Sequence, residues 1–259
     1  MNVLQTLTLT VALCATATLG HARPLEAVRK NGTLLLATEG QYAPFNFFQG
    51  KQLTGFEVEV AELVTRQMGL KPEWKTLSFD ALLTGLQQDR WDVVIASHAI
   101  TDERAKAVTF TLPHYCSGGM VLSLSPALRS AKDLAGKTVA VQTGTTYAAE
   151  LRRLPGIKDV KNFPSDTDAR SALVSKRVDA MVTDRFVAKE LLRKSPTAGF
   201  HPGDMVTIER VAAAVALGNT GLADAWSQAL KAVMADGRYA RISQKYFQED
   251  VRCPEGPGR

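Results

Sequence analysis

Four short segments of the chain carry side chains that could bind a small charged molecule. Arg104 has a planar guanidinium, which can hold a carboxylate through two parallel hydrogen bonds. Asp184 has a carboxylate, which can accept hydrogen bonds from an ammonium group. Glu39 is a further carboxylate, and the turn that contains Thr146 leads into a helix pattern whose first N–H groups suit an anion. Together the four segments offer groups of opposite charge.

Each segment also has a purely structural interpretation, which the residues alone do not exclude. Arg104 could form a surface ion pair, and such a pair contributes little stability. Thr146 could belong to a turn with a threonine N-cap, and Asp184 could cap the helix that follows it. Glu39, within ATEGQYAPFNF at residues 37–47, could lie in an ordinary polar loop. The elements that position these segments have to decide between the two interpretations.

Apolar runs that predict strands alternate along the chain with patterns that predict helices, and the alternation forms two units. The first unit has predicted strands at residues 33–38, 72–77 and 91–96, separated by predicted helices at residues 56–68 and from residue 78 onward. The second unit has predicted strands at residues 137–142, 160–163 and 178–183, with predicted helices at residues 147–154, 166–175 and 185–192. This order is typical of mostly parallel sheets. We therefore predict two α/β lobes with a cleft between them.

Two extended segments, at residues 114–118 and 207–211, join the units and are the predicted hinges. Lobe 1 would then contain residues 23–113 and 212–259, and lobe 2 would contain residues 119–206. These boundaries make lobe 1 discontinuous in sequence.

The candidate residues share a position relative to the predicted strands. Open parallel sheets bind ligands beyond the carboxyl ends of their strands. Glu39, residues 97–104, residues 144–147 and Asp184 each follow a predicted strand. We therefore expect these segments to converge on one cleft.

Composition excludes some classes of function. The 259 residues are 45% hydrophobic and 22% charged, as in a soluble globular protein, and the net charge of +5 is modest. Basic residues are spread along the chain without a patch of interleaved aromatics, so nucleic acid is not an expected partner. The four histidines show no spacing typical of metal ligands, and we expect no metal site.

The first 22 residues differ from the rest of the chain. They contain no Lys, Arg, Asp or Glu and end in Gly20-His21-Ala22, which predicts a secretory signal peptide cleaved before Arg23. A membrane anchor is the alternative interpretation. Two cysteines follow, Cys116 and Cys253, and export would permit a disulfide. The sequence leaves open whether they pair or whether one is a buried thiol and the other a thiol in the tail.

Seven segments, in order, resemble the polar amino acid-binding family of extracytoplasmic solute-binding proteins, bacterial family 3, which serve ABC importers. The segments are ATEGQYAPFNF (37–47), LTGFEVE (53–59), SFDALLTGLQQDRWDVV (78–94), ITDER (100–104), DLAGKTVAVQTGTTY (133–147), RVDAMVTD (177–184) and GRYARISQKYF (237–247). The resemblance implies a two-lobed periplasmic-binding-protein-like type II fold. In that fold each lobe is a mostly parallel sheet flanked by helices, and the ligand cleft lies between the lobes with two hinge segments.

The resemblance also implies a role for each candidate residue. Arg104 is expected to hold the α-carboxylate of an amino acid with the help of Thr146, and Asp184 to hold the α-ammonium. The remaining expected site residues surround the side chain of the ligand, with Tyr42 and Phe79 sandwiching it, Glu39 at its far end and Ser97 offering a polar contact. The family usually has Ser or Thr where this chain has Ala99, so one hydroxyl near the head group is missing. His98 is expected to point away from the ligand.

These roles imply a binding protein without catalysis or cofactor. The expected ligand is a polar, cationic L-amino acid of the arginine, lysine, ornithine and histidine class, and a glutamine-type ligand is the alternative. The expected partner is the membrane permease of an ABC importer, and we expect a monomer in the periplasm or another extracytoplasmic space. A second hypothesis is an enzyme similar to cyclohexadienyl or arogenate dehydratases, in which Glu39 would be a general acid. A third is a ligand-sensing domain.

Overall fold

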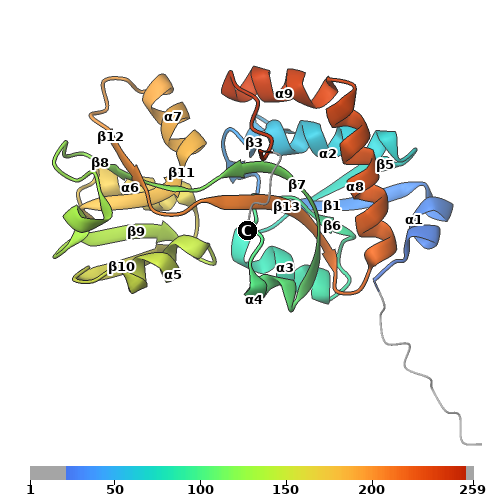
Figure 1. Ribbon diagram of the computed structural model, residues 1–259, viewed down its shortest axis with the longest axis horizontal. Coiled ribbons are helices and arrows are strands. Elements are labelled where there is room, and N and C mark those ends of the chain that lie inside the picture. The colour runs from blue at the N-terminus through green and yellow to red at the C-terminus, as the bar shows by residue number, and fades with distance from the viewer. Residues whose placement is uncertain (1–21, 255–259) are drawn as a thin grey trace, which may run out of the picture.

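A computed structural model describes residues 22–254 and shows two α/β lobes side by side (Figure 1). The predicted signal peptide therefore lies outside the described residues, apart from Ala22. The sheet of lobe 1 has the strand order β5 (Lys71–Thr76), β1 (Thr33–Thr38), β6 (Val93–Val94), β13 (Glu209–Ala216), β7 (Val108–Ser117). Strand β1 pairs in parallel with β5 and β6, whereas β13 runs antiparallel to β6 and β7.

Helices cover both faces of this sheet because its strands are apolar on both faces. Leu34 and Leu36 of β1 belong to the core under α2 and α8, whereas Leu35 and Ala37 belong to the core under α3. A strand with two buried faces reads as a continuous apolar run, which is why β1 is recognisable in the sequence. The helices of lobe 1 are α1 (Leu25–Asn31), α2 (Phe56–Gln67), α3 (Phe79–Gln87), α4 (Asp102–Ala105), α8 (Thr220–Ala235) and α9 (Arg238–Phe247).

Lobe 2 repeats this design on a second five-stranded sheet. Its strand order is β10 (Asp159–Phe163), β9 (Thr138–Gln142), β11 (Ala180–Asp184), β8 (Gly119–Ser123), β12 (His201–Met205). Strand β9 pairs in parallel with β10 and β11, and β8 runs antiparallel to β11 and β12. The flanking helices are α5 (Thr146–Arg153), α6 (Asp166–Val174) and α7 (Arg185–Lys194), with a short 3-10 helix at Ala131–Leu134.

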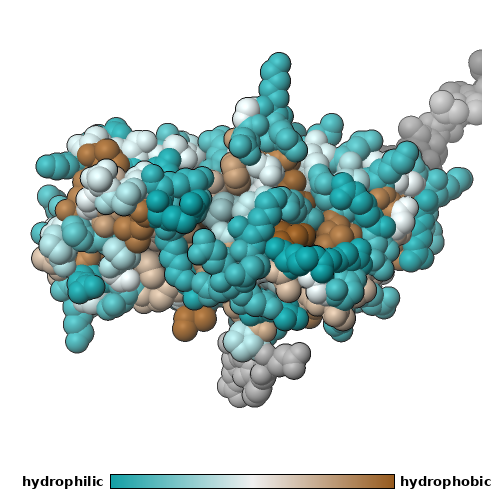
Figure 2. Space-filling view, turned by 90° about the horizontal axis from the view of Figure 1, so that it is seen from above, coloured by the Kyte–Doolittle hydropathy of each residue, from teal (hydrophilic) through white to brown (hydrophobic). Residues whose placement is uncertain are grey.

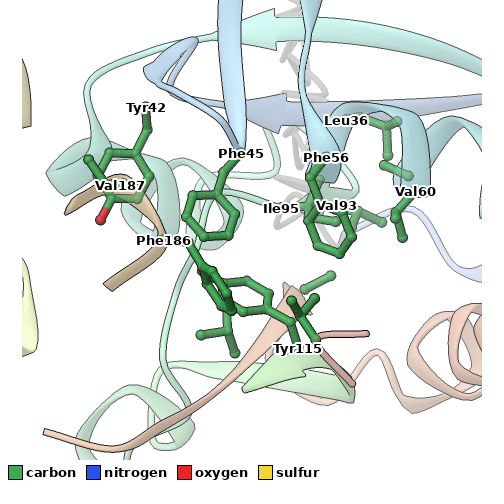
Figure 3. Packing of buried hydrophobic residues seen from close by; sticks show 14 of the residues in the cluster. Leu36, Tyr42, Phe45, Phe56, Val60, Val93, Ile95, Tyr115, Phe186 and Val187 are labelled. Atoms are coloured by element: carbon green, nitrogen blue, oxygen red, sulfur yellow. The ribbon is translucent and has the colours of Figure 1, made fainter. Parts of the chain in front are cut away.

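The segment that contains Glu39 is more ordered than a polar loop. It leads into a small three-stranded antiparallel sheet of β2 (Gln41–Tyr42), β3 (Asn46–Gln49) and β4 (Gln52–Thr54). Phe45, between β2 and β3, is fully buried and stacks on Tyr42 and on Tyr115 at centroid distances of 5.6 and 4.9 Å (Figure 3). Phe186 from α7 of lobe 2 packs edge-on against Phe45 at 6.3 Å, so the two lobes share an aromatic cluster beside the cleft (Figure 3).

The chain crosses between the lobes twice, in adjacent segments. One crossing lies between β7 and β8 at Gly118, and the other lies between β12 and β13 near Thr207. A Cβ on Gly118 would come within 2.0 Å of the Thr207 carbonyl oxygen, so the close approach of the two backbones requires glycine. The Thr207 hydroxyl accepts a hydrogen bond from the Gly119 N–H at 2.7 Å, which ties the crossings together.

Cys116 of β7 and Cys253 form a disulfide, with their Cα atoms 4.8 Å apart. The structure thus decides a question that the sequence leaves open. The bond fixes the C-terminal segment against β7 next to the crossing point, and the Cys116 N–H also donates to the Val251 carbonyl at 3.0 Å.

The exterior is mostly polar. Seen from above, hydrophilic residues cover most of the face, with smaller hydrophobic areas between them (Figure 2). Within residues 22–254, no helix combines the length and the apolar character needed to cross a bilayer.

Candidate functional site

A pocket with a cavity volume of about 20 Å³ lies between the lobes. This volume is close to that of a single water molecule, so the two lobes lie close together around the pocket. Both lobes and the start of β13 line it, through Tyr42, Phe79, Ser97, Ala99, Arg104, Gln142, Thr145, Thr146, Tyr147 and Glu209. Six of the eight residues expected from the sequence are therefore brought together: Tyr42, Phe79, Ser97, Ala99, Arg104 and Thr146.

Arg104 reaches from lobe 1 to lobe 2 across this pocket. It belongs to α4, whose N-cap Thr101 accepts the Arg104 N–H at 3.1 Å. Its guanidinium donates through Nη1 to the Ala99 carbonyl at 2.8 Å and through Nη2 to the Gly144 carbonyl of lobe 2 at 2.9 Å. Burial lowers the pKa of Arg104, which the nearby Glu209 carboxylate opposes, and a guanidinium stays charged throughout the physiological range. A fixed cation therefore spans the two lobes.

The first turn of α5 forms the facing wall of lobe 2. Thr146 is the first residue of α5, and the first N–H groups of a helix have no acceptor within it. Gly144 in the preceding turn has φ +82° and lies against Asp80 of lobe 1, so the turn fits closely against the other lobe. The Thr146 hydroxyl, which we expected to face a ligand carboxylate, instead donates to the carboxylate of Glu209 in this structure.

Asp184 is buried at the end of β11, directly behind the pocket wall. Its carboxylate caps α7 by accepting the Phe186 N–H at 2.7 Å, and its own N–H donates to the Tyr42 hydroxyl at 3.3 Å. Burial raises the pKa of Asp184 to about 7, although the Phe186 N–H opposes the shift. Within the described residues, the lining of the pocket includes neither Asp184 nor Glu39.

Glu39 forms a polar bridge to lobe 2. The Gln142 amide nitrogen donates to Glu39 Oε1 at 2.7 Å. Burial raises the pKa of Glu39 to about 7, and the bond from Gln142 acts in the opposite direction. Gln142 lines the pocket and was not among the residues we expected from the sequence, although it is the last residue of β9 and the rule about strand ends could have selected it.

The pocket residues Tyr42 and Phe79 are held in place by different neighbours. Tyr42 is held by Phe45 and by the Asp184 N–H. Phe79 stacks on the buried His98 ring at a centroid distance of 4.2 Å, and the Arg104 guanidinium lies 5.8 Å from the Phe79 centroid. Burial lowers the pKa of His98, so its imidazole is a neutral stacking partner. His98 is absent from the pocket lining described above, as we expected.

A buried carboxylate, Glu57, joins two of the segments that build the site. It accepts the Ser97 N–H and hydroxyl at 2.7 and 3.0 Å, and the Asn46 amide at 2.8 Å. Asn46 in turn accepts the Gly40 N–H at 2.9 Å, which fixes the turn next to Glu39, and His114 Nε2 lies 2.9 Å from Glu57 Oε1. The Ser97 hydroxyl is therefore directed to Glu57, and its backbone has φ +59°, a conformation that the network supports.

Glu209 is the other pocket residue that sequence reasoning missed. It begins β13, in a segment that we interpreted only as a hinge. Because it lies at the start of its strand, a rule that selects the carboxyl ends of strands cannot find it.

Comparison with known proteins finds a matching family and a similar amino acid-binding protein. The family model described as "Bacterial extracellular solute-binding proteins, family 3" matches residues 34–249, which confirms the resemblance seen in the sequence. The L-cystine-binding protein TcyJ of Escherichia coli (strain K12) is 34% identical over 232 residues, covering 88% of this chain and 87% of that protein.

Two solved structures share the two-lobed fold. An ancestral arginine-binding protein bound to arginine is 34% identical with a TM-score of 0.80, covering 88% of this chain and 100% of that one. An ancestral arginine-binding protein bound to glutamine is 35% identical with a TM-score of 0.80, covering 84% and 99%.

Proposed function

Because the chain belongs to family 3 of the bacterial extracellular solute-binding proteins, we propose that it binds a cationic L-amino acid and delivers it to the permease of an ABC importer. The ligand would be of the arginine, lysine, ornithine and histidine class. The relatives named above bind amino acids that differ in side chain, so the specificity has to be argued from this pocket.

The charge balance of the site carries the proposal. Among the residues that line the pocket, the cation Arg104 lies near Glu209, and the buried carboxyl groups of Glu39 and Asp184 lie behind the lining. An amino acid brings a carboxylate for Arg104 and an ammonium for an acid, and these two groups cancel. The remaining carboxylates favour a ligand with an additional positive charge, since a buried anion without a partner is costly.

The carboxylates lie in two separate groups, which suits the two ends of an amino acid. Glu209 is close enough to influence the pKa of both Arg104 and Asp184, and Arg104 influences the pKa of Glu209 in turn. The charged neighbours that influence Glu39 are different ones, namely Asp166, Asp80 and Glu57. The first group would bind what all amino acids share, and Glu39 would bind the tip of the side chain.

In the proposed complex, Arg104 and the first turn of α5 hold the α-carboxylate, and Asp184 takes part in holding the α-ammonium. Tyr42 and Phe79 enclose the aliphatic part of the ligand. One oxygen of Glu39 receives the Gln142 amide, and the other would bind the positive tip. A ligand with contacts to both lobes stabilises their closed arrangement, which a permease would recognise.

Calorimetric titration with arginine, lysine, ornithine, histidine and glutamine tests the proposal. We expect micromolar or tighter binding of at least one cationic member, which corresponds to about −8 kcal/mol or better. Tightest binding of glutamine would overturn the specificity, and binding of none of the five would overturn the ligand class.

A second candidate function has one observation in its favour. A buried carboxyl with a pKa of about 7, such as Glu39, is suited to general acid catalysis near neutral pH. A dehydratase would convert prephenate to phenylpyruvate, or arogenate to phenylalanine, with release of water and carbon dioxide. Glu39 would protonate the hydroxyl that leaves as water, as the ring carboxylate leaves as carbon dioxide and its electron pair completes the aromatic ring. If the protein binds an amino acid and forms neither product, this candidate is excluded.

We further propose that the chain is exported through a cleaved signal peptide and acts as a monomer. The Cys116–Cys253 disulfide supports an oxidising, extracytoplasmic compartment. Mass determination of the exported protein would show whether the mature chain begins at Arg23, and light scattering would give its oligomeric state.

A further inference from the structure

Glu209 supplies the only carboxylate among the residues that line the pocket within the described chain. Asp184, the acid expected from the sequence to hold the ligand's ammonium, is buried behind that lining. The pocket therefore presents Arg104 and Glu209 as its exposed pair of opposite charges.

The position of Glu209 is fixed from both lobes. Val211 pairs with Ala99 in an isolated bridge, and Glu209 lies two residues earlier on the same strand face. The Thr146 hydroxyl of lobe 2 donates to Glu209 Oε1. Burial raises the pKa of Glu209, whereas the Thr146 hydroxyl and the charge of Arg104 lower it. The carboxylate is thus held in the lining of the pocket that Ala99 and Arg104 also line.

We propose that Glu209 is a specificity-determining residue that accepts the α-ammonium of the ligand together with Asp184. An ammonium group has three N–H donors, whereas a carboxylate can accept several hydrogen bonds and has none to donate. Ala99 has no hydroxyl to offer at this end of the pocket. Glu209 provides an acceptor that the Thr146 hydroxyl already orients.

The electrostatic interaction between Glu209 and Asp184 supports the same role for Glu209. The charge of Glu209 raises the pKa of the buried Asp184, so the two carboxylates repel each other. A cation bound between them would relieve that repulsion and gain a charge-assisted bond to each. A neutral amide in place of the ligand's ammonium would not relieve the repulsion between Glu209 and Asp184.

The inference rests on the proposed function, and the experiment separates the two. Titrations would compare wild type, Glu209→Gln and Glu150→Gln. Glu150 is a matched control because it lies one turn further along α5, is close enough to raise the pKa of Glu209, and pairs with Arg153 at 2.6 Å outside the pocket. Each protein would be titrated with arginine and with δ-guanidinovalerate, which is arginine without its α-amine, and with lysine and ε-aminocaproate as the corresponding second pair.

We expect Glu209→Gln to weaken arginine or lysine by about tenfold or more, as for loss of a charge-assisted bond, and to change the amine-free analogue by less than about threefold. Glu150→Gln should change none of them by more than about threefold. An equal loss for both members of a pair would assign Glu209 a structural role and overturn the inference. Tighter binding would also overturn it, because Glu209 would then compete with the ligand's carboxylate for Arg104 and Thr146. If wild type binds no amino acid, the proposed function itself fails.

Discussion

Replacement of Glu39 by Gln is expected to stabilise the empty protein while it removes the preference for a cationic ligand. Burial raises the pKa of Glu39 from its ordinary 4.5 to about 7. Each pH unit across that interval corresponds to about 1.4 kcal/mol, so ionising Glu39 in the empty protein costs about 3 kcal/mol. Glutamine has a similar shape and its amide oxygen can still accept the Gln142 amide, so the variant avoids this cost.

The sign of the pH dependence follows from the direction of the shift. The folded protein binds the Glu39 proton more tightly than the unfolded chain does. The stability that this proton contributes is therefore fully present below pH 4.5 and is lost as the pH rises through about 7. The advantage of Glu39→Gln should therefore be small near pH 4.5 and reach about 3 kcal/mol at pH 8.

Urea unfolding of the ligand-free proteins at pH 5, 6, 7 and 8 measures this difference. Glu73→Gln on β5 is the control, because it removes an exposed carboxylate from the same lobe. The reasoning is refuted if Glu39→Gln is less stable than wild type at pH 8, or if the difference does not change with pH. The expected result would show that Glu39, as a binding residue, lowers the stability of the protein when no ligand is bound.

Three further predictions test other parts of the account. Glu57→Ala should lower the free energy of unfolding by about 3 kcal/mol or more, because it leaves several buried donors without an acceptor. Glu62→Ala, at a half-buried position of the same helix that pairs with Arg66, should lower it by less than about 1 kcal/mol, and equal effects in urea would contradict the role of the network. Arg104→Ala should weaken the tightest-binding amino acid by about 30-fold or more in calorimetry, and a change within threefold would remove Arg104 from the site. Cys253→Ser should lower the free energy of unfolding by up to about 5 kcal/mol, because Cys116 and Cys253 are separated by 137 residues; reduction of wild type should give the same urea midpoint as the variant.

Local patterns in the sequence were sufficient to predict the α/β units of both lobes. Strands β1 and β9 are apolar on both faces, and the helices between strands show clear amphipathic stripes. The three strands β2, β3 and β4 were not predicted, because each has only two to four residues and no periodicity can be read from so short a run. Strands β7 and β13 were recognised only as extended segments, since the apolar pattern of a strand does not reveal its distant partner.

The site was predictable where it follows a strand and not elsewhere. Arg104 and Tyr42 were reached from strand ends and from the family resemblance, and both line the pocket. Glu209 was missed because it begins a strand, and its neighbours in space are Thr146 and Arg104, which are distant in sequence. The pairing of Cys116 with Cys253 is a contact of the same long-range kind.

The central claim is that Glu39 selects a ligand with a positive tip, and citrulline, the neutral counterpart of arginine with nearly the same shape, tests it most directly. Calorimetric titration of wild type with both ligands should give arginine an advantage of about 30-fold or more, as expected for loss of a buried charge pair. In Glu39→Gln the same ratio should fall to within about threefold. Equal affinities of wild type for arginine and citrulline, or an unchanged ratio in the variant, would contradict the account.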